Sequence, residues 1–186
     1  MSTPSPAVQT TDTLLSISAL ARARADIPLE LFKAIRERGG EVEDCRIAPI
    51  GDRIAANLVV SGNWSTLGRL ETALPGIAER LDLQVRFERC APRGQNPDFR
   101  PYGVDVIAPQ QADLLVHLLE FFNDQGVQVA EISSQKYAST YTGAGMYSVQ
   151  MVLHVPVSQH PQALRESFMD LCDDLNADGM LDPIKT

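Results

Sequence analysis

The chain has 186 residues, of which 44% are hydrophobic, so it can bury a core in one or two domains. Its formal net charge is −8, and its arginines are dispersed among acidic residues, which argues against direct binding to nucleic acid. No apolar run approaches the ~20 residues that a membrane-spanning helix needs, so no membrane partner is expected.

Residues 1–12 are rich in Ser, Thr and Pro and lack the basic start and apolar core of a signal peptide. This composition predicts a tail without regular structure. The three cysteines, Cys45, Cys90 and Cys172, are odd in number and far apart, which suits a reducing compartment. We therefore expect a cytoplasmic protein.

The first half of the chain, residues 13–90, predicts a strand–helix–strand–strand–helix–strand order. Strands are expected over 13–20, 42–50, 54–60 and 83–87, and helices from Pro28 to Gly39 and over 64–81. Pro28 suits the first turn of a helix, and Gly39-Gly40 stops it. Pro75-Gly76 is expected to kink or restart the second helix. Trp64, at the start of that helix, is expected to pack onto the core.

Residues 91–101 contain three prolines and predict a linker, after which residues 102–186 predict the same order again. Strands are expected over 102–107, 127–137 and 146–155, with a short final strand within 180–186. Helices are expected over 110–125 and 161–176, with Leu114, Leu115, Leu118, Leu119 and Phe122 facing inward in the first of them. A longer loop, residues 138–145, joins the two central strands.

The two halves are related by a repeat. Gly39-Gly40-Glu41-Val42 corresponds to Gly126-Val127-Gln128-Val129, a displacement of 87 residues, and apolar positions of the flanking strand and helix coincide at the same displacement. Two copies of a βαββαβ module follow. The expected fold is of the α+β class, with two tandem ferredoxin-like modules, each an antiparallel four-stranded sheet with helices on one face.

Residues with catalytic or metal-binding chemistry are sparse. His117, His154 and His160 have no second His or Cys at metal-ligand spacing, and a structural role is expected for each. The chain has no glycine-rich phosphate loop and no nucleophile motif. We therefore expect no enzyme activity, no metal and no cofactor. An enzyme on the same fold stays an open alternative, since fold does not fix function.

The module geometry suggests a site for a small amino acid. The loop after the first strand of each module, residues 21–27 and 108–112, leads into a helix N-terminus, whose free N–H groups suit a carboxylate. The start of the second strand is expected close alongside. The candidate ligand-binding residues are Arg24, Asp26, Ile27, Glu43 and Asp44 in the first module and Pro109, Gln110, Gln111 and Glu131 in the second. The alternative is that these loops are connections and the acids face water.

Four segments carry a resemblance to tandem ACT domains, and more closely to the glycine cleavage system transcriptional repressor family. They are residues 17–20, 42–48, 58–64 (Leu-Val-Val-Ser-Gly-Asn-Trp) and 128–131. The resemblance covers roughly residues 13–179. One departure lies in the first loop, where the family usually has Gly-x-Asp-Arg-Pro-Gly-Ile-Val and this chain has residues 21–28 as Ala-Arg-Ala-Arg-Ala-Asp-Ile-Pro. Both glycines are replaced, which restricts the backbone.

The resemblance implies a cytosolic regulator of glycine catabolism genes that binds a DNA-bound transcriptional activator and releases it when glycine rises. It implies a small amino acid, possibly glycine, as ligand and no direct contact with nucleic acid. The alternative is an ACT-like interaction or scaffold module that has lost its ligand. In either case we expect the two modules to pair within one chain or the chain to form a homodimer, because exposed sheet edges are a liability.

Overall fold

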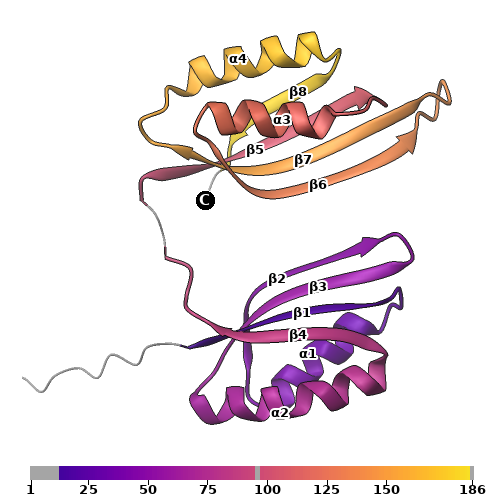
Figure 1. Cartoon of the computed structure of the whole chain (residues 1–186), viewed down its shortest axis with the longest axis vertical. Helices are drawn as coiled ribbons and strands as arrows, with labels where there is room; N and C mark the ends of the chain where they lie inside the picture. The colour runs from indigo at the N-terminus through magenta and orange to yellow at the C-terminus, as the bar shows by residue number, and fades with distance from the viewer. Residues whose placement is uncertain (1–12, 95–96, 185–186) are drawn as a thin grey trace, which may run out of the picture. The chain divides into compact units, whose positions relative to one another are not determined.

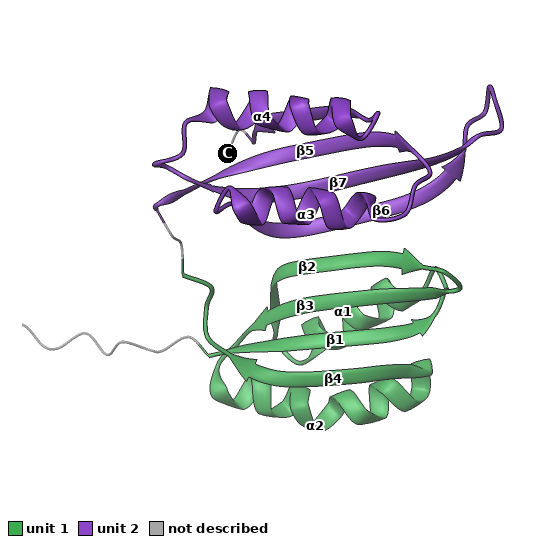
Figure 2. Cartoon of the chain, turned by 45° about the horizontal axis from the view of Figure 1, so that its top comes forward, with its two compact units in different colours: residues 1–94 green, residues 95–186 purple. Residues whose placement is uncertain are grey.

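A computed structural model describes residues 13–94 and 97–184 of the chain. It divides into two compact units, residues 1–94 (unit 1) and 95–186 (unit 2), coloured separately in Figure 2. Over the described residues, each unit is a four-stranded antiparallel sheet with two helices on one face (Figure 1). The expected fold class is thereby confirmed.

Unit 1 follows the expected order of elements. These are β1 (Leu14–Arg22), α1 (Ile27–Glu37), β2 (Glu41–Ile50), β3 (Arg53–Ser61), α2 (Trp64–Leu81) and β4 (Leu83–Cys90). The strand order across the sheet is β2-β3-β1-β4. Side chains alternate along each strand, so Leu15, Ile17 and Ala19 of β1 are buried beneath the helices while Ser16, Ser18 and Leu20 face the other way.

Unit 2 repeats this topology, with the strand order β6-β7-β5-β8. Its elements are β5 (Phe99–Pro109), α3 (Leu114–Asp124), β6 (Gln128–Ala138), β7 (Gly145–Pro156), α4 (Pro161–Asp174) and β8 (Asp178–Pro183). Its core is more aromatic than that of unit 1, because Phe122 stacks on Phe168 with ring centroids 5.7 Å apart. Unit 1 instead has an aliphatic core built largely from leucine, isoleucine, valine and alanine.

The 87-residue displacement survives in the backbone geometry. Helices α1 and α3 have bounds that correspond exactly at this displacement. Gly39 and Gly126, which end the two helical turns, both have a positive φ, +80° and +66°, which favours glycine. Both second strands also shift register at the corresponding point, between Val42 and Asp44 and between Val129 and Glu131.

Three expectations about element bounds need correction. Strand β5 begins at Phe99, inside the expected linker, because Phe99 to Pro101 already pair with β7. Helix α3 begins at Leu114 rather than at residue 110, because the chain is still paired to β7 at Pro109 and Asp113 is left-handed. Helix α2 runs unbroken through Pro75 and does not restart.

Two side chains point differently from the expectation. Leu119 is 40% exposed, because three buried positions of α3 (Leu114, Leu118 and Phe122) already form its core face. Trp64 is 77% exposed and lies against the guanidinium of Arg89, whose carbon is 4.7 Å from the ring centroid. Arg89 lies on the helix-facing side of β4 and also forms an ion pair with Glu71 of α2, so Trp64 packs on this arginine rather than on the core.

Candidate functional site

The loops that precede α1 and α3 are held in the same way in both units. The amide N–H of Ala23 donates to the carbonyl of Asp52 in the β2–β3 turn, at 3.0 Å. At the corresponding position of unit 2, the amide N–H of Gln110 donates to the carbonyl of Gly145 at the start of β7, at 2.8 Å. Each loop is therefore fixed, next to a helix N-terminus, to the hairpin formed by the second and third strands of its own module.

Arg24 and Asp26 form a two-bonded ion pair across the first loop. Arg24 Nε donates to Asp26 Oδ1 at 3.1 Å and Arg24 Nη2 donates to Asp26 Oδ2 at 2.5 Å. This hydrogen bonding lowers the pKa of the Asp26 carboxyl and raises the pKa of the Arg24 guanidinium. Both side chains are 49% exposed, so a ligand carboxylate can reach the guanidinium only in competition with Asp26.

The residues that replace the two family glycines in the first loop, Ala21 and Asp26, do not strain its backbone. Ala21 is buried in the core of unit 1, and Asp26 has an ordinary φ of −83°. Ile27 belongs to the same core and is 1% exposed, so it shapes the helix start from beneath. The first loop therefore adopts its conformation without needing glycine at either position.

The second loop is built differently. Asp113 precedes α3 with a φ of +56°, which is left-handed, and its side chain makes no capping hydrogen bond. Gln110 folds against Gly145, where an added Cβ would lie 2.6 Å from Gln110 Oε1. Gln111 Nε2 donates to the carbonyl of Leu175 at the end of α4, at 3.1 Å. Pro109 is the exposed last residue of β5.

The acids of the second strands do not lie beside these loops. In the strand register, Asp44 of β2 lies opposite Val59 of β3. Arg22 of β1, next to the first loop, lies opposite Arg53 of β3. Six residues of strand separate Val59 from Arg53, which is about 20 Å. Glu131 is likewise paired with Val152, six residues from the Met146 that pairs with Pro109. Because a helix crosses over between them, the second strand runs parallel to the first and starts at the same end of the sheet. The loop follows the other end of the first strand, so the acids at the start of the second strand lie far from it.

The strand acids have partners of their own at that end of the sheet. Glu43 lies at the register shift of β2 and accepts a hydrogen bond from Ser61 Oγ at 2.5 Å. The Asp44 carboxylate forms an ion pair with the guanidinium of Arg46 on the same strand. The expected juxtaposition of loop and acids is thus wrong. Glu43, Asp44 and Glu131 are candidates only for a contact separate from the one at the loops.

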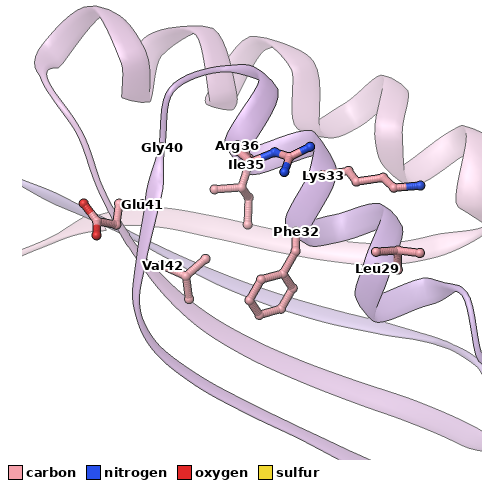
Figure 3. Close-up of a pocket in the computed structure, with 8 residues that line it drawn as sticks. All are labelled: Leu29, Phe32, Lys33, Ile35, Arg36, Gly40, Glu41 and Val42. Carbon is pink, nitrogen blue, oxygen red and sulfur yellow. The ribbon is translucent and has the colours of Figure 1, made fainter.

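Sequence reasoning missed an apolar hollow between α1 and the start of β2. It has a volume of about 390 Å³ and is lined by Leu29, Phe32, Lys33, Ile35, Arg36, Gly40, Glu41 and Val42. Figure 3 shows Phe32, Ile35 and Val42 turned toward the hollow, while the Glu41 carboxylate points away from it. The sequence signal for it is Leu29, a leucine beside Pro28 that falls outside the apolar stripe of the helix. In the structure Leu29 is 57% exposed.

The described residues offer no group of three or more His, Cys, Asp or Glu side chains that could hold a metal ion. Among the same residues, no helix is long and apolar enough to cross a membrane. Cys172 is buried against acidic neighbours, and burial raises the pKa of its thiol to about 11. A thiol with a raised pKa stays protonated, and the protonated thiol is a poor nucleophile.

Residues 13–88 match the ACT domain family. The glycine cleavage system transcriptional repressor of Escherichia coli (strain K12) is 25% identical over 170 residues, which is 91% of this chain and 90% of that protein. The repressor of the same name from Shigella flexneri gives the same figures. The chain therefore has two tandem modules of ACT-type fold, of which the first matches the ACT domain family, and it resembles the glycine cleavage system transcriptional repressors.

Two solved structures share the fold over nearly the whole chain. A crystal structure assigned to a glycine cleavage system transcriptional repressor superposes with a TM-score of 0.69 at 24% identity, covering 95% of this chain and all of that one. A protein of unknown function from Galdieria sulphuraria superposes with a TM-score of 0.73 at 20% identity, covering 94% of this chain and all of that one. The resemblance to the repressors supports a regulatory rather than a catalytic role for this tandem ACT-domain protein.

Proposed function

We propose that this tandem ACT-domain protein is a cytoplasmic regulator of glycine cleavage system genes. It acts by contacting a DNA-bound transcriptional activator, and it responds to a small amino acid. The observation that carries the proposal is that the similarity to the repressor extends over 91% of this chain and 90% of the relative, and so includes both modules.

Charge supports a protein partner over DNA. The chain has 24 acidic and 16 basic side chains and a net charge of −8, so it lacks the basic surplus that phosphate-backbone binding requires. A repressor of this composition needs another protein to bring it to DNA, which is the reason for placing an activator between the two.

The amino acid is proposed to bind at the loops before the helices. Arg24 and Asp26 supply a cation and an anion at the start of α1, and Pro109, Gln110 and Gln111 form the corresponding loop before α3. A free amino acid carries both charges, so it can exchange partners with the Arg24–Asp26 pair. The side chain of Ile27 is buried in the core of unit 1 and so anchors the start of α1.

One observation favours the alternative of a ligand-free interaction module. Arg24 and Asp26 already satisfy each other, and Gln111 is engaged with the carbonyl of Leu175. A ligand has to displace the first of these contacts, which reduces its net affinity.

A reporter assay tests the proposed function. The chain is expressed in a bacterial strain that lacks its own glycine cleavage repressor and carries a reporter on the glycine cleavage promoter. We expect repression without added glycine and its loss when glycine is supplied. Reporter activity that is the same with and without the chain would exclude this function.

Two arginine variants locate the response. Arg24→Ala is expected to keep repression but to blunt its response to glycine, because the loop loses the cation that is paired with Asp26. Arg36→Ala removes an arginine at the rim of the apolar hollow and is the matched control. If Arg36→Ala blunts the response and Arg24→Ala does not, the ligand binds at the hollow instead.

A further inference from the structure

The net charge of the chain belongs to one of its two units. Residues 1–94 have twelve acidic and twelve basic side chains, so unit 1 carries no formal net charge. Residues 95–186 have twelve acidic and four basic side chains, so unit 2 carries the whole net charge of −8. A charge asymmetry of this size between two halves of one chain favours a partner of opposite charge for the unbalanced half.

The open face of the unit 2 sheet, which faces away from α3 and α4 (Figure 1), carries four of these acids. Along β5 and β7, side chains alternate between this face and the buried one. The register of the other strands against these two then assigns their side chains to a face. It places His154 and four acidic side chains on the open face, the acids being Asp105, Glu131, Asp178 and Asp182.

The cations of unit 2 lie elsewhere, over the residues that the structure describes. Arg100 and Lys136 lie opposite residues of β7 that belong to the core or pack against it, and so are on the helix-facing side. Arg165 is on α4 and forms an ion pair with Asp182 at 2.8 Å, which neutralises one of the four acids. Lys185 lies outside the described residues. The described part of the open face therefore has acids without a lysine or arginine among them.

Acidic and apolar side chains alternate in a block formed by β5 and β8. Asp105 is exposed on β5, and its carboxylate accepts a hydrogen bond from Gln150 Nε2 at 2.9 Å. In the register, Asp105 lies opposite Met180, and Ile107 lies opposite Asp178. Met180 and Ile107 are 56% and 45% exposed. Neither Asp105 nor Asp178 has an ion pair within the described part of the chain.

The corresponding place in unit 1 is built from other residues. Ser18 corresponds to Asp105 at the 87-residue displacement. Ser18 lies opposite Arg86 of β4, where Asp105 lies opposite Met180 of β8. The repeated fold therefore does not require the acid and the methionine of unit 2, and we ask what else they serve.

We propose that the open face of the unit 2 sheet docks an arginine-rich segment of a partner protein, with guanidinium groups on Asp105 and Asp178 and their aliphatic stems on Met180 and Ile107. Charge complementarity selects the occupant, because a carboxylate is the group that a guanidinium binds with two parallel bonds. The stem of an arginine packs on apolar surface while its charged head reaches an acid. The inference rests on the proposed function for its DNA-bound partner, since proteins that bind DNA carry basic surfaces.

The test uses the full chain and a fluorescein-labelled peptide in which arginine and serine alternate, with binding followed by fluorescence anisotropy. We expect binding that weakens as ionic strength rises, because exposed charges are screened. The double variant Asp105→Asn with Asp178→Asn is expected to weaken binding about tenfold or more. The matched control, Glu120→Gln with Asp170→Asn, removes the same charge from α3 and α4 and is expected to change binding by less than about twofold.

A pair of methionine variants tests the apolar part of the contact. Met180→Ser is expected to weaken binding about threefold, because the arginine stems lose apolar surface to pack on. Met169→Ser, at a methionine of α4 that is 42% exposed, is the control and is expected to leave binding unchanged. An unchanged melting temperature in each variant shows that its fold is retained.

Three outcomes would overturn the proposal. One is equal weakening within either matched pair, because the attraction then comes from the diffuse charge of unit 2 or from any exposed methionine. Another is no binding of the peptide by the unmodified chain at low ionic strength. The third is a dimer in light scattering that dissociates in Met180→Ser, because the face then joins two copies of the chain.

The reporter assay keeps this inference separate from the proposed function. If the chain does not repress the reporter but the two double variants still differ in peptide binding, the docking face stands and the proposed function fails. If the chain represses the reporter but the two double variants bind the peptide equally, the proposed function stands. The docking face then fails on its own.

Discussion

At the scale of single residues, two ion pairs of unit 1 differ in how far they are shielded from water. Arg24 and Asp26 are both 49% exposed, so their pair adds little stability. Arg89 and Glu71 are 22% and 31% exposed, and Glu71 accepts two bonds from the guanidinium, at 2.5 and 2.8 Å. The Nη1 atom of Arg89 is buried without a hydrogen-bond partner among the described residues, so Arg89 depends on Glu71 for its place.

This dependence predicts a pH-sensitive stability difference. The Arg89 hydrogen bonds lower the pKa of the Glu71 carboxyl, so its stabilising effect is present above the ordinary value of 4.5 and is lost as pH falls through the lowered pKa. Glu71→Gln should reduce the free energy of unfolding by about 1 kcal/mol at neutral pH. The difference should vanish in acid. Urea unfolding across pH measures this, with Glu79→Gln on the same helix as control. A constant difference at every pH would contradict the prediction.

Gly62 gives a second prediction at this scale. A Cβ at Gly62 would lie 2.6 Å from Thr66 Cγ2 and 3.1 Å from Thr66 Cβ, and Thr66 is buried at the start of α2. Gly62→Ala should therefore destabilise the protein by about 2 kcal/mol through overpacking. Gly68 of α2 has open space around its Cα, so Gly68→Ala should stabilise by about 0.5 to 1 kcal/mol. Thermal unfolding measures both variants. A higher melting temperature for Gly62→Ala than for Gly68→Ala would contradict the prediction and show that the turn at Gly62 can adjust to a side chain.

At the scale of elements, the repeat made the fold predictable because local patterns and topology agree. The apolar spacing of the strands and helices recurs in both copies, as does the glycine that ends the first helix, down to the positive φ of Gly39 and Gly126. The candidate site was misplaced although the predicted order of elements already implies its geometry. A helical crossover makes the second strand parallel to the first, so Asp44 at the start of the second strand lies at the opposite end of the sheet from the loop that follows the first strand. Trp64 was also misplaced, because an aromatic ring can pack on an arginine as well as on a core.

The left-handed residue before α3 gives a prediction about this element. Asp113 and Asp26 occupy the same position of the repeat, but their φ angles are +56° and −83°. Asp113→Gly should raise the free energy of unfolding by about 1 kcal/mol, because glycine adopts a positive φ without steric cost. Asp26→Gly should give no gain. Chemical denaturation of both variants checks this, and equal effects at the two positions would contradict the explanation.

At the scale of the whole molecule, each sheet has two outer strands that pair on one side only within the sheet. The outer strands are β2 and β4 in unit 1 and β6 and β8 in unit 2, over the described residues. Unpaired edges invite pairing with another strand. Pairing of the two modules within one chain, or formation of a homodimer, stays a prediction. Light scattering and NMR relaxation test it, and a monomer whose halves tumble independently would count against both forms.

The central claim is that this tandem ACT-domain protein senses a small amino acid, and a thermal-shift screen of the purified chain against the twenty amino acids tests it most directly. Ligand at 100 times its dissociation constant adds ~2.7 kcal/mol to stability. We predict a rise in melting temperature with glycine or a small relative such as serine, reduced in Arg24→Ala. A melting temperature that no amino acid moves would contradict the claim and leave a ligand-free interaction module.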